Sequence, residues 1–328
     1  MGVFVFLPLV LPLTAWPIAR LAQQHLHPRT STRLLSWVAG VMAVCSTLCL
    51  CLLMVVGTAQ LPGNPLPDGW SDQEVRDAVP YDEIAGRAAI PALLAVAVAC
   101  AVALWRQHRV RRRARAALAG LPDTPIAVLP DTAAYAYALP AKGRPAPGRG
   151  RRERPRRTRR PGGRVVVTTG MLAGLNSPER RALFAHERAH LAARHHRFLL
   201  AVRLAARANP FLLPLRTAVV YSAERWADED AAHAVGSRRA VARAIGRAAL
   251  ISRPGPAPAL PALAAPGPVP RRVAALLGPA PAVRSWPPLW TAVGLAARTA
   301  AVGTALSAMS SANAAVALFQ VLQAATPL

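Results

Sequence analysis

The chain has 328 residues, and its 40 lysines and arginines against 15 aspartates and glutamates give a formal net charge of +25. Hydrophobic residues still make up 53% of it, because apolar and basic residues occupy different stretches, so there is room for one or two small domains plus membrane spans. All four cysteines lie in apolar runs without a CxxC pair, which excludes a disulfide framework or a cysteine metal site: Cys45, Cys49, Cys51 and Cys100.

Three apolar stretches come before residue 106, namely Val3 to Ala22, Leu35 to Ala59 and Ala88 to Trp105. Each approaches the roughly 20 residues that cross the hydrocarbon core of a bilayer, so the sequence predicts three transmembrane helices. The first stretch lacks the basic region that precedes the apolar run of a signal peptide, and we interpret it as a retained span. Thr299 to Ala324 predicts a fourth, C-terminal span, with two short hairpin helices as the alternative.

The charges of the predicted loops indicate how these spans are oriented. The first loop contains three arginines and no acidic residue, and six arginines follow Trp105 within ten residues. The loop between the second and third spans is acidic, with Asp68, Asp72, Glu74, Asp77, Asp82 and Glu83. Because basic loops stay on the cytoplasmic side, we predict a multi-pass protein of the cell membrane whose region after Trp105 is cytoplasmic.

This pattern predicts four regions along the chain. Residues 1–105 hold the three spans and the acidic outer loop, 106–253 one compact domain, 254–285 a Pro/Ala-rich linker and 286–328 the C-terminal span. A basic insert at 142–163 is rich in Pro, Gly and Arg, and neither it nor the linker has enough apolar residues to fold. The insert either contacts anionic lipid or is a solvated loop. Without interleaved aromatic residues or a DNA-reading motif, we expect no direct nucleic acid binding.

A short motif in the compact domain carries metal chemistry. His186-Glu187-Arg188-Ala189-His190 fits H-E-x-x-H, on a helix predicted to begin at Ser177-Pro178. Histidines four residues apart share one face of a helix and can bind one metal ion. Glu187 then lies beside the metal, where it can take a proton from a zinc-bound water. The alternative is a coincidental match on a solvated helix.

A third ligand of the right kind lies downstream. Glu224 belongs to a run without Gly or Pro from Leu215 to Val235, and the break before it lets two helices lie antiparallel. Two histidines and one glutamate leave an open position, which predicts one catalytic Zn²⁺ per chain. Asp228, one turn on, can accept the second N–H of a ligand histidine, or else pair on the surface with Arg225 or another arginine.

The residues before the motif predict a short strand. Val165 to Thr169 is a β-branched run between Gly163 and Gly170. As an edge strand beside the helix it can bind an extended peptide by strand addition; a strand that only caps the helices is the alternative. His195 and His196 follow the motif off its metal-facing side, and we assign them a helix-end or surface role.

The strand, the H-E-x-x-H helix and the later Glu224-Arg225-Trp226-Ala227-Asp228 helix resemble the gluzincin membrane peptidases. These include the HtpX-type quality-control proteases and the BlaR/MecR-type antirepressor proteases, and the predicted order of spans looks more like the latter. The resemblance implies a mainly α membrane protein with a cytoplasmic zincin-like α+β metallopeptidase domain. It also implies zinc bound by His186, His190 and Glu224, with Glu187 as general base.

The resemblance further implies that the partner is a protein substrate, in that family often a transcriptional repressor. Almost nothing follows the last predicted span, so we expect no beta-lactam sensor domain. Three hypotheses stay open: a regulatory protease, a broad-specificity quality-control protease and a non-catalytic membrane scaffold, the last disfavoured by the intact motif residues. Tyr221 and His233 are equal candidates for polarising the scissile carbonyl.

Overall fold

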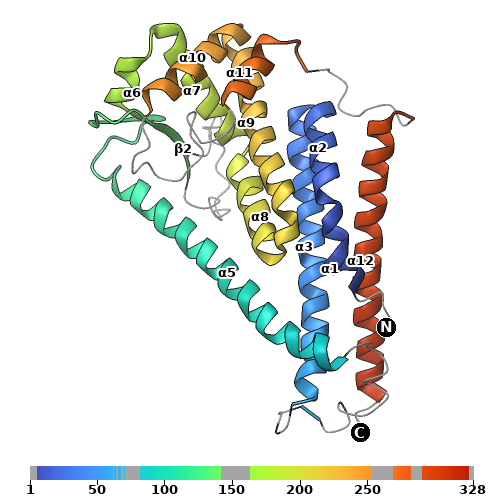
Figure 1. The fold of residues 1–328 in the computed structure, drawn as a ribbon. Coiled ribbons are helices and arrows are strands. Elements are labelled where there is room, and N and C mark those ends of the chain that lie inside the picture. Colours follow the sequence, from blue (N-terminus) through green and yellow to red (C-terminus); the bar gives the residue numbers. More distant parts are fainter. Residues whose placement is uncertain are drawn as a thin grey trace, which may run out of the picture. The chain divides into compact units, whose positions relative to one another are not determined.

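The computed structural model describes residues 6–61, 63, 66–67, 70, 82–141, 163–252, 269–281 and 290–324. They form two compact units (Figure 1). The apolar unit comprises Met1–Trp105, Phe198–Val220 and Ala282–Leu328, and the sheet unit comprises Arg106–Arg197 and Tyr221–Pro281. Most of the predicted acidic loop, the basic insert up to residue 162 and residues 253–268 lie outside the described residues, so the predictions made there stay predictions.

The apolar unit is helical. Its elements are α1 (Leu7–Val10), the 3₁₀ helix η2 (Leu11–Thr14), α2 (Ala15–His25), α3 (Pro28–Ala59), most of α5 (Asp82–Ala116), most of α8 (His195–Ala208), η4 (Pro210–Leu212), the first part of α9 (Leu213–Val235) and α12 (Ala292–Ala324). Three helical stretches are long and apolar enough to cross a membrane: Pro28–Ala59, Ile84–Ala116 and Gly294–Ala324. They contain the second, third and C-terminal predicted spans.

The first predicted span, Val3 to Ala22, is not confirmed. Its described residues are divided among α1, η2 and the start of α2, and none of these helices has spanning length. Pro8 and Pro12 lie in the first turns of α1 and η2, and Pro17 in the first turn of α2. Proline suits a helix start but interrupts a helix interior, so three prolines in ten residues divide the segment. At the other end, α12 is one unbroken helix and not a hairpin.

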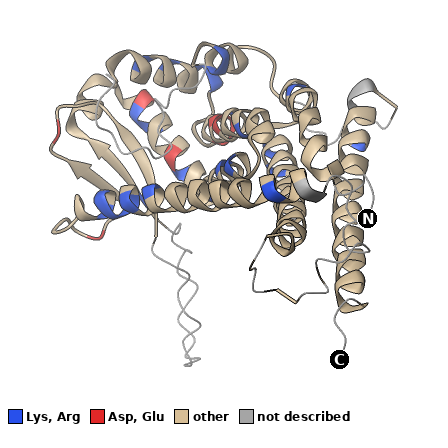
Figure 2. Ribbon diagram, turned by 60° about the horizontal axis from the view of Figure 1, so that its bottom comes forward, with Lys and Arg blue, Asp and Glu red and all other residues tan. Residues whose placement is uncertain are grey.

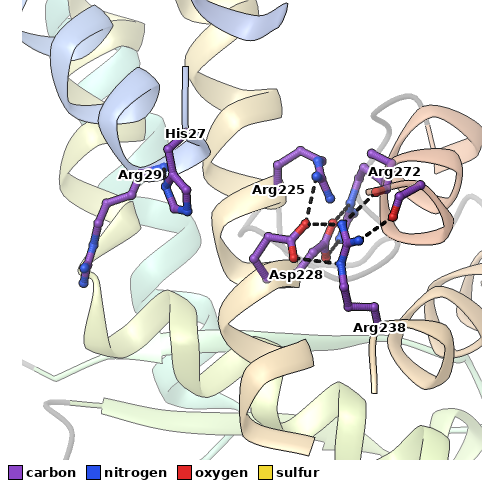
Figure 3. A network of polar contacts seen from close by, with 9 residues as sticks. His27, Arg29, Arg225, Asp228, Arg238 and Arg272 are labelled. Carbon is purple, nitrogen blue, oxygen red and sulfur yellow. Dashed lines mark hydrogen bonds and ion pairs between the residues drawn. The ribbon is translucent and has the colours of Figure 1, made fainter. Parts of the chain in front are cut away.

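Helix α3 has a distinct contact at each of its two ends. Helix α3 begins after His27, whose Nδ1 accepts a hydrogen bond from the Arg29 backbone N–H at 3.3 Å (Figure 3). Near its other end α3 approaches α5 so closely that a Cβ on Gly57 would lie 2.2 Å from the carbonyl carbon of Gly86. Only glycine allows such an approach of two backbones, so these glycines define the helix crossing.

The sheet unit contains β1 (Ile126–Leu129), β2 (Ala136–Pro140) and β3 (Gly163–Thr168) in the order β1-β3-β2. The predicted strand is present as β3, but its predicted edge position is wrong. It is the central strand, parallel to β1 and antiparallel to β2. Val165, Val166 and Val167 are all buried, as expected of a β-branched run covered on both faces. Strand β2 lies at the sheet edge and packs against α7 (Ser177–Ala192).

Helices α6 (Thr169–Gly174), α7, α10 (Arg238–Ile251) and α11 (Val269–Leu277) complete the sheet unit with the second part of α9. Helix α7 begins at a capping box in which Asn176 and Glu179 bond each other's backbone N–H groups. Leu183 of α7 and Ile245 of α10 lie in one core with Met171. Helix α11 falls within the region predicted as a linker, so that region is not all linker.

Charge is unevenly distributed between the two units. Among the described residues, all aspartates and glutamates except Asp82 and Glu83 lie in the sheet unit. Figure 2 shows the same contrast, with α3 and α12 uncharged over most of their length. Long apolar helices without acidic residues suit a bilayer.

Candidate metal centre

Helix α7 places both histidines of the motif on one face. The Nε2 atoms of His186 and His190 are 3.1 Å apart, and their ring centroids are 4.7 Å apart. His186 and Glu187 are fully buried and His190 is 3% exposed. A charged residue is rarely buried without a partner or a metal, so this burial indicates a built polar site and not a solvated helix face.

Helix α9 brings Glu224 to the two histidines. Its Oε2 lies 3.6 Å from His186 Nε2 and its Oε1 lies 3.5 Å from His190 Nε2. One donor atom from each of the three side chains lies within 4.8 Å of the others. Two atoms bound to one zinc at about 2.1 Å in a tetrahedral arrangement are roughly 3.4 Å apart, so this donor set fits a zinc ion. The structure therefore brings the predicted ligand trio together.

Asp228 lies directly behind His186. Its Oδ1 is 3.0 Å from His186 Nδ1, on the side of the ring away from the other ligands. It is fully buried, and within the described residues Arg225 forms its ion pair with Glu229, at 2.9 Å. The surface pairing of Asp228 with Arg225, the alternative to a role at the site, is therefore wrong. A carboxylate in this position fixes the orientation and tautomer of a ligand histidine.

Arg272 is a site residue that the sequence did not predict. From α11 its guanidinium donates to both oxygens of Asp228, at 2.6 and 2.9 Å, and lies 3.0 Å from Glu224 Oε2. Figure 3 shows it with Arg225 and Arg238 around the carboxylates of α9. One signal was available: Arg272 and Leu276 share a face of a short amphipathic helix, and both are buried.

His195 also lies in the site: it is the first residue of α8, a helix end as predicted, but its predicted surface alternative is wrong. It is fully buried, its Nδ1 is 2.8 Å from His190 Nδ1, and its ring packs edge-on against Trp226 at 4.6 Å between centroids. The prediction assumed one continuous helix, in which position 195 points away from the metal. Helix α7 instead ends at Ala192, and Arg194 has φ 55°, a left-handed conformation that redirects the chain. His196 is half-buried.

The charges around the site favour the binding of a metal cation. Burial alone would lower the pKa of His186, but hydrogen bonds to Asp228 and Glu224 raise it to about 9. Burial lowers the pKa of His190 to about 4 and that of His195 to about 2. Burial would raise the pKa of Glu224, yet Arg272 and the histidines hold it well below its usual value. The site thus combines ionised carboxylates with a neutral imidazole at His190.

The two candidates for polarising a substrate carbonyl lie in different surroundings. Tyr221 is half-buried one turn before Glu224, and the Arg271 guanidinium covers its ring at 4.3 Å. His233 is exposed, more than two turns beyond Glu224. Of the two, Tyr221 is the nearer to the ligand trio along α9.

A buried His-His-Glu cluster on two helices, with a glutamate next to the first histidine, is the arrangement of a metallopeptidase site. Residues 158–206 match the model of Peptidase family M48, which confirms the resemblance to membrane zinc metallopeptidases predicted from the sequence. The matched segment holds β3 and the histidines and glutamate of α7, and it ends before Glu224 and Asp228. No curated protein and no solved structure gives a significant match.

Proposed function

We propose that this protein is a membrane-anchored zinc metalloendopeptidase that hydrolyses peptide bonds of a cytoplasmic or membrane protein. The observation that carries the proposal is the convergence of His186, His190 and Glu224, with donor atoms within 4.8 Å, next to the buried Glu187. The match of residues 158–206, which include His186, Glu187 and His190, to a peptidase family also supports it. Two histidines and a glutamate would hold one zinc and leave a position open for chemistry.

Each residue has a role in the proposed reaction. Bound zinc would polarise the scissile carbonyl and lower the pKa of a water molecule. Glu187 takes a proton from the attacking water while the new C–O bond forms, and gives it to the leaving amine as the C–N bond breaks. Asp228 orients His186, and Arg272 keeps Asp228 and Glu224 ionised. Their burial excludes bulk water from the ligands.

The test is zinc content and proteolysis of detergent-purified protein, wild type beside Glu187→Gln. The variant keeps the shape of the side chain but not its basicity, so we expect about one zinc per chain and a loss of casein or self-cleavage of about 10²- to 10⁴-fold. Glu179→Gln is the matched control, because Gln also serves in the capping box of α7. Wild-type protein without zinc, or a fully active Glu187→Gln, would overturn the proposal.

We further propose that the catalytic unit faces the cytoplasm. Six arginines lie between residues 106 and 115, directly after the apolar part of α5, and basic residues next to a span stay inside. Labelling of single cysteines introduced at exposed positions of the sheet unit, with an impermeant reagent in intact cells, tests this. Protection until the cells are lysed supports the cytoplasmic side, and labelling in intact cells refutes it.

Within this activity we propose a regulatory, antirepressor-like role on a specific protein, with broad quality control as the alternative. The proposal rests on the resemblance of the catalytic motifs and of the predicted spans after the first. Comparing new protein N-termini in cells that express the wild type or Glu187→Gln separates the two. Cleavage of one or a few proteins supports regulation, and cleavage of many unrelated membrane proteins supports quality control.

A further inference from the structure

The two histidine ligands have different partners behind them. On the far side of its ring, His186 meets the Asp228 carboxylate at 3.0 Å. His190 instead meets a second imidazole, with Nδ1 of His195 at 2.8 Å from its own Nδ1. A carboxylate behind a ligand histidine is the common arrangement, and a second imidazole is a different one. One of the two Nδ1 atoms must donate a proton for this contact to be a hydrogen bond.

The geometry allows one assignment of these protons when a metal is bound. His190 presents Nε2 to His186 and Glu224, so the metal takes the lone pair of Nε2, and the proton of the neutral ring is on Nδ1. That N–H donates across the 2.8 Å contact, and His195 Nδ1 accepts with its lone pair. His195 then carries its own proton on Nε2. The pair thus uses His195 as an acceptor and not as a ligand.

The position of His195 is fixed from two sides. The left-handed Arg194 ends the turn after α7 and places His195 at the first residue of α8. Its ring then packs edge-on against Trp226, at 4.6 Å and 63°, and is fully buried. Trp226 lies between Glu224 and Asp228 on α9, the helix that supplies the third ligand. His195 therefore connects the second histidine ligand to the ligand helix.

We infer that His195 is a positioning residue for the metal site, which fixes the tautomer and ring orientation of His190 as Asp228 does for His186. This inference rests on the proposed zinc site. Because its acceptor is neutral, His195 orients His190 without adding negative charge behind the ring. A second carboxylate there would make the ligand more basic and the metal less electrophilic.

Asn and Gln variants at position 195 give the sharpest test. The amide of His195→Asn occupies the place of Nδ1 and can accept from His190, whereas the amide of His195→Gln occupies the place of Nε2, away from it. His195→Leu removes both groups. We expect Leu and Gln to lower zinc affinity about 10- to 100-fold, measured by competition with a chromophoric chelator, and Asn to restore most of it. His196→Asn, a change at the half-buried neighbour, is the matched control.

Replacing zinc by Co²⁺ adds a measurement that a general loss of stability would not change. With Co²⁺ in the site, the visible absorption reports the ligand field, so Leu and Gln should shift the band and Asn should leave it near that of the wild type. We also expect kcat to fall with little change in KM in the Leu and Gln variants. Equal zinc affinities and spectra for Asn and Gln, or a Leu variant with wild-type affinity and spectrum, would overturn the inference.

These readouts separate the inference from the proposed function. If the wild type binds zinc but cleaves nothing, the proposed proteolysis fails, while zinc affinity and the cobalt spectrum still decide the role of His195. If the wild type cleaves and all three variants bind zinc normally, only the inference fails. If His195→Leu does not fold, the comparison of Asn with Gln decides alone.

Discussion

In the apolar unit, the buried hydroxyls of Thr32 and Ser36 bond within their own helix, whereas in the sheet unit the buried Arg272 and Asp228 bond across tens of positions. Thr32 and Ser36 donate to carbonyl oxygens four residues earlier, at 2.8 and 2.6 Å. Arg272 and Asp228 are 44 positions apart in the chain. Local bonds satisfy polar groups inside a bilayer whatever a helix packs against, but a long-range network is satisfied only when all its members are in place. The two units should therefore respond differently to substitution.

The largest effect is expected where Glu224 and Asp228 lose the arginine that contacts both of them. Arg272→Met leaves Glu224 and Asp228 buried without the guanidinium that both contact. Breaking a buried ion pair from one side costs about 3–5 kcal/mol. We expect this loss of stability in denaturant unfolding of the metal-free protein. Arg271→Met, at the neighbouring exposed position, should lower the free energy of unfolding by less than about 1 kcal/mol. Equal losses in the two variants would show that the contacts of Arg272 with Glu224 and Asp228 do not stabilise the fold.

A smaller change in the same network affects the metal more than the fold. Asp228→Asn keeps an acceptor for His186 but removes the charge that Arg272 pairs with. We expect zinc affinity to fall about 10- to 100-fold in chelator competition. Asp230→Asn, an exposed position on the same helix, serves as the control. Wild-type zinc affinity in Asp228→Asn would show that Asp228 does not orient the ligand.

In the apolar unit, backbone approach matters more than polar groups. Gly57→Ala introduces a Cβ 2.2 Å from Gly86, whereas a Cβ at Gly40, on the same helix, meets nothing within 4 Å. Both changes raise helix propensity equally, so their difference isolates the crossing of α3 with α5. We expect Gly57→Ala to be less stable than Gly40→Ala by about 1–3 kcal/mol, measured by unfolding in detergent. Equal stabilities would rule out the close crossing.

The smallest effect is expected for a buried hydroxyl of a membrane helix. Thr32→Val removes the bond to the Pro28 carbonyl but keeps the shape of the side chain. The carbonyl keeps its helical partner, and polar contacts inside membrane helices contribute about 0.6 kcal/mol on average. We therefore expect a loss of less than about 1 kcal/mol in the same unfolding assay. A loss as large as that of Arg272→Met would remove the distinction between the units.

Features set by local spacing were predictable from the sequence. The two motif histidines lie four residues apart on one helix, and the long apolar stretches after the first lie in helices long enough to span. The prolines of Val3 to Ala22 also indicate where this segment is divided, whereas its apolar composition alone does not. The strand was predictable, and its place in the sheet was not, because pairing depends on residues elsewhere in the chain.

Residues brought in by tertiary contacts escaped prediction. The position of His195 depends on the left-handed backbone conformation of Arg194. Helical periodicity in the sequence does not reveal such a conformation. Arg272 lay in a stretch whose composition resembles a linker, and its role follows only from contacts with α9. Long-range electrostatics of this kind has no signature in residue spacing.

The place of Arg272 in the chain has a consequence for biosynthesis. The ribosome adds both histidines, Glu187, Glu224 and Asp228 before it adds the arginine that contacts the two carboxylates, 44 residues after Asp228. Arg238 then holds the end of α11 by donating to the Ala275 and Gly278 carbonyls, at 2.8 and 2.5 Å. A nascent chain that already carries every proposed metal ligand therefore lacks the counter-charge of its site until residue 272 has been added.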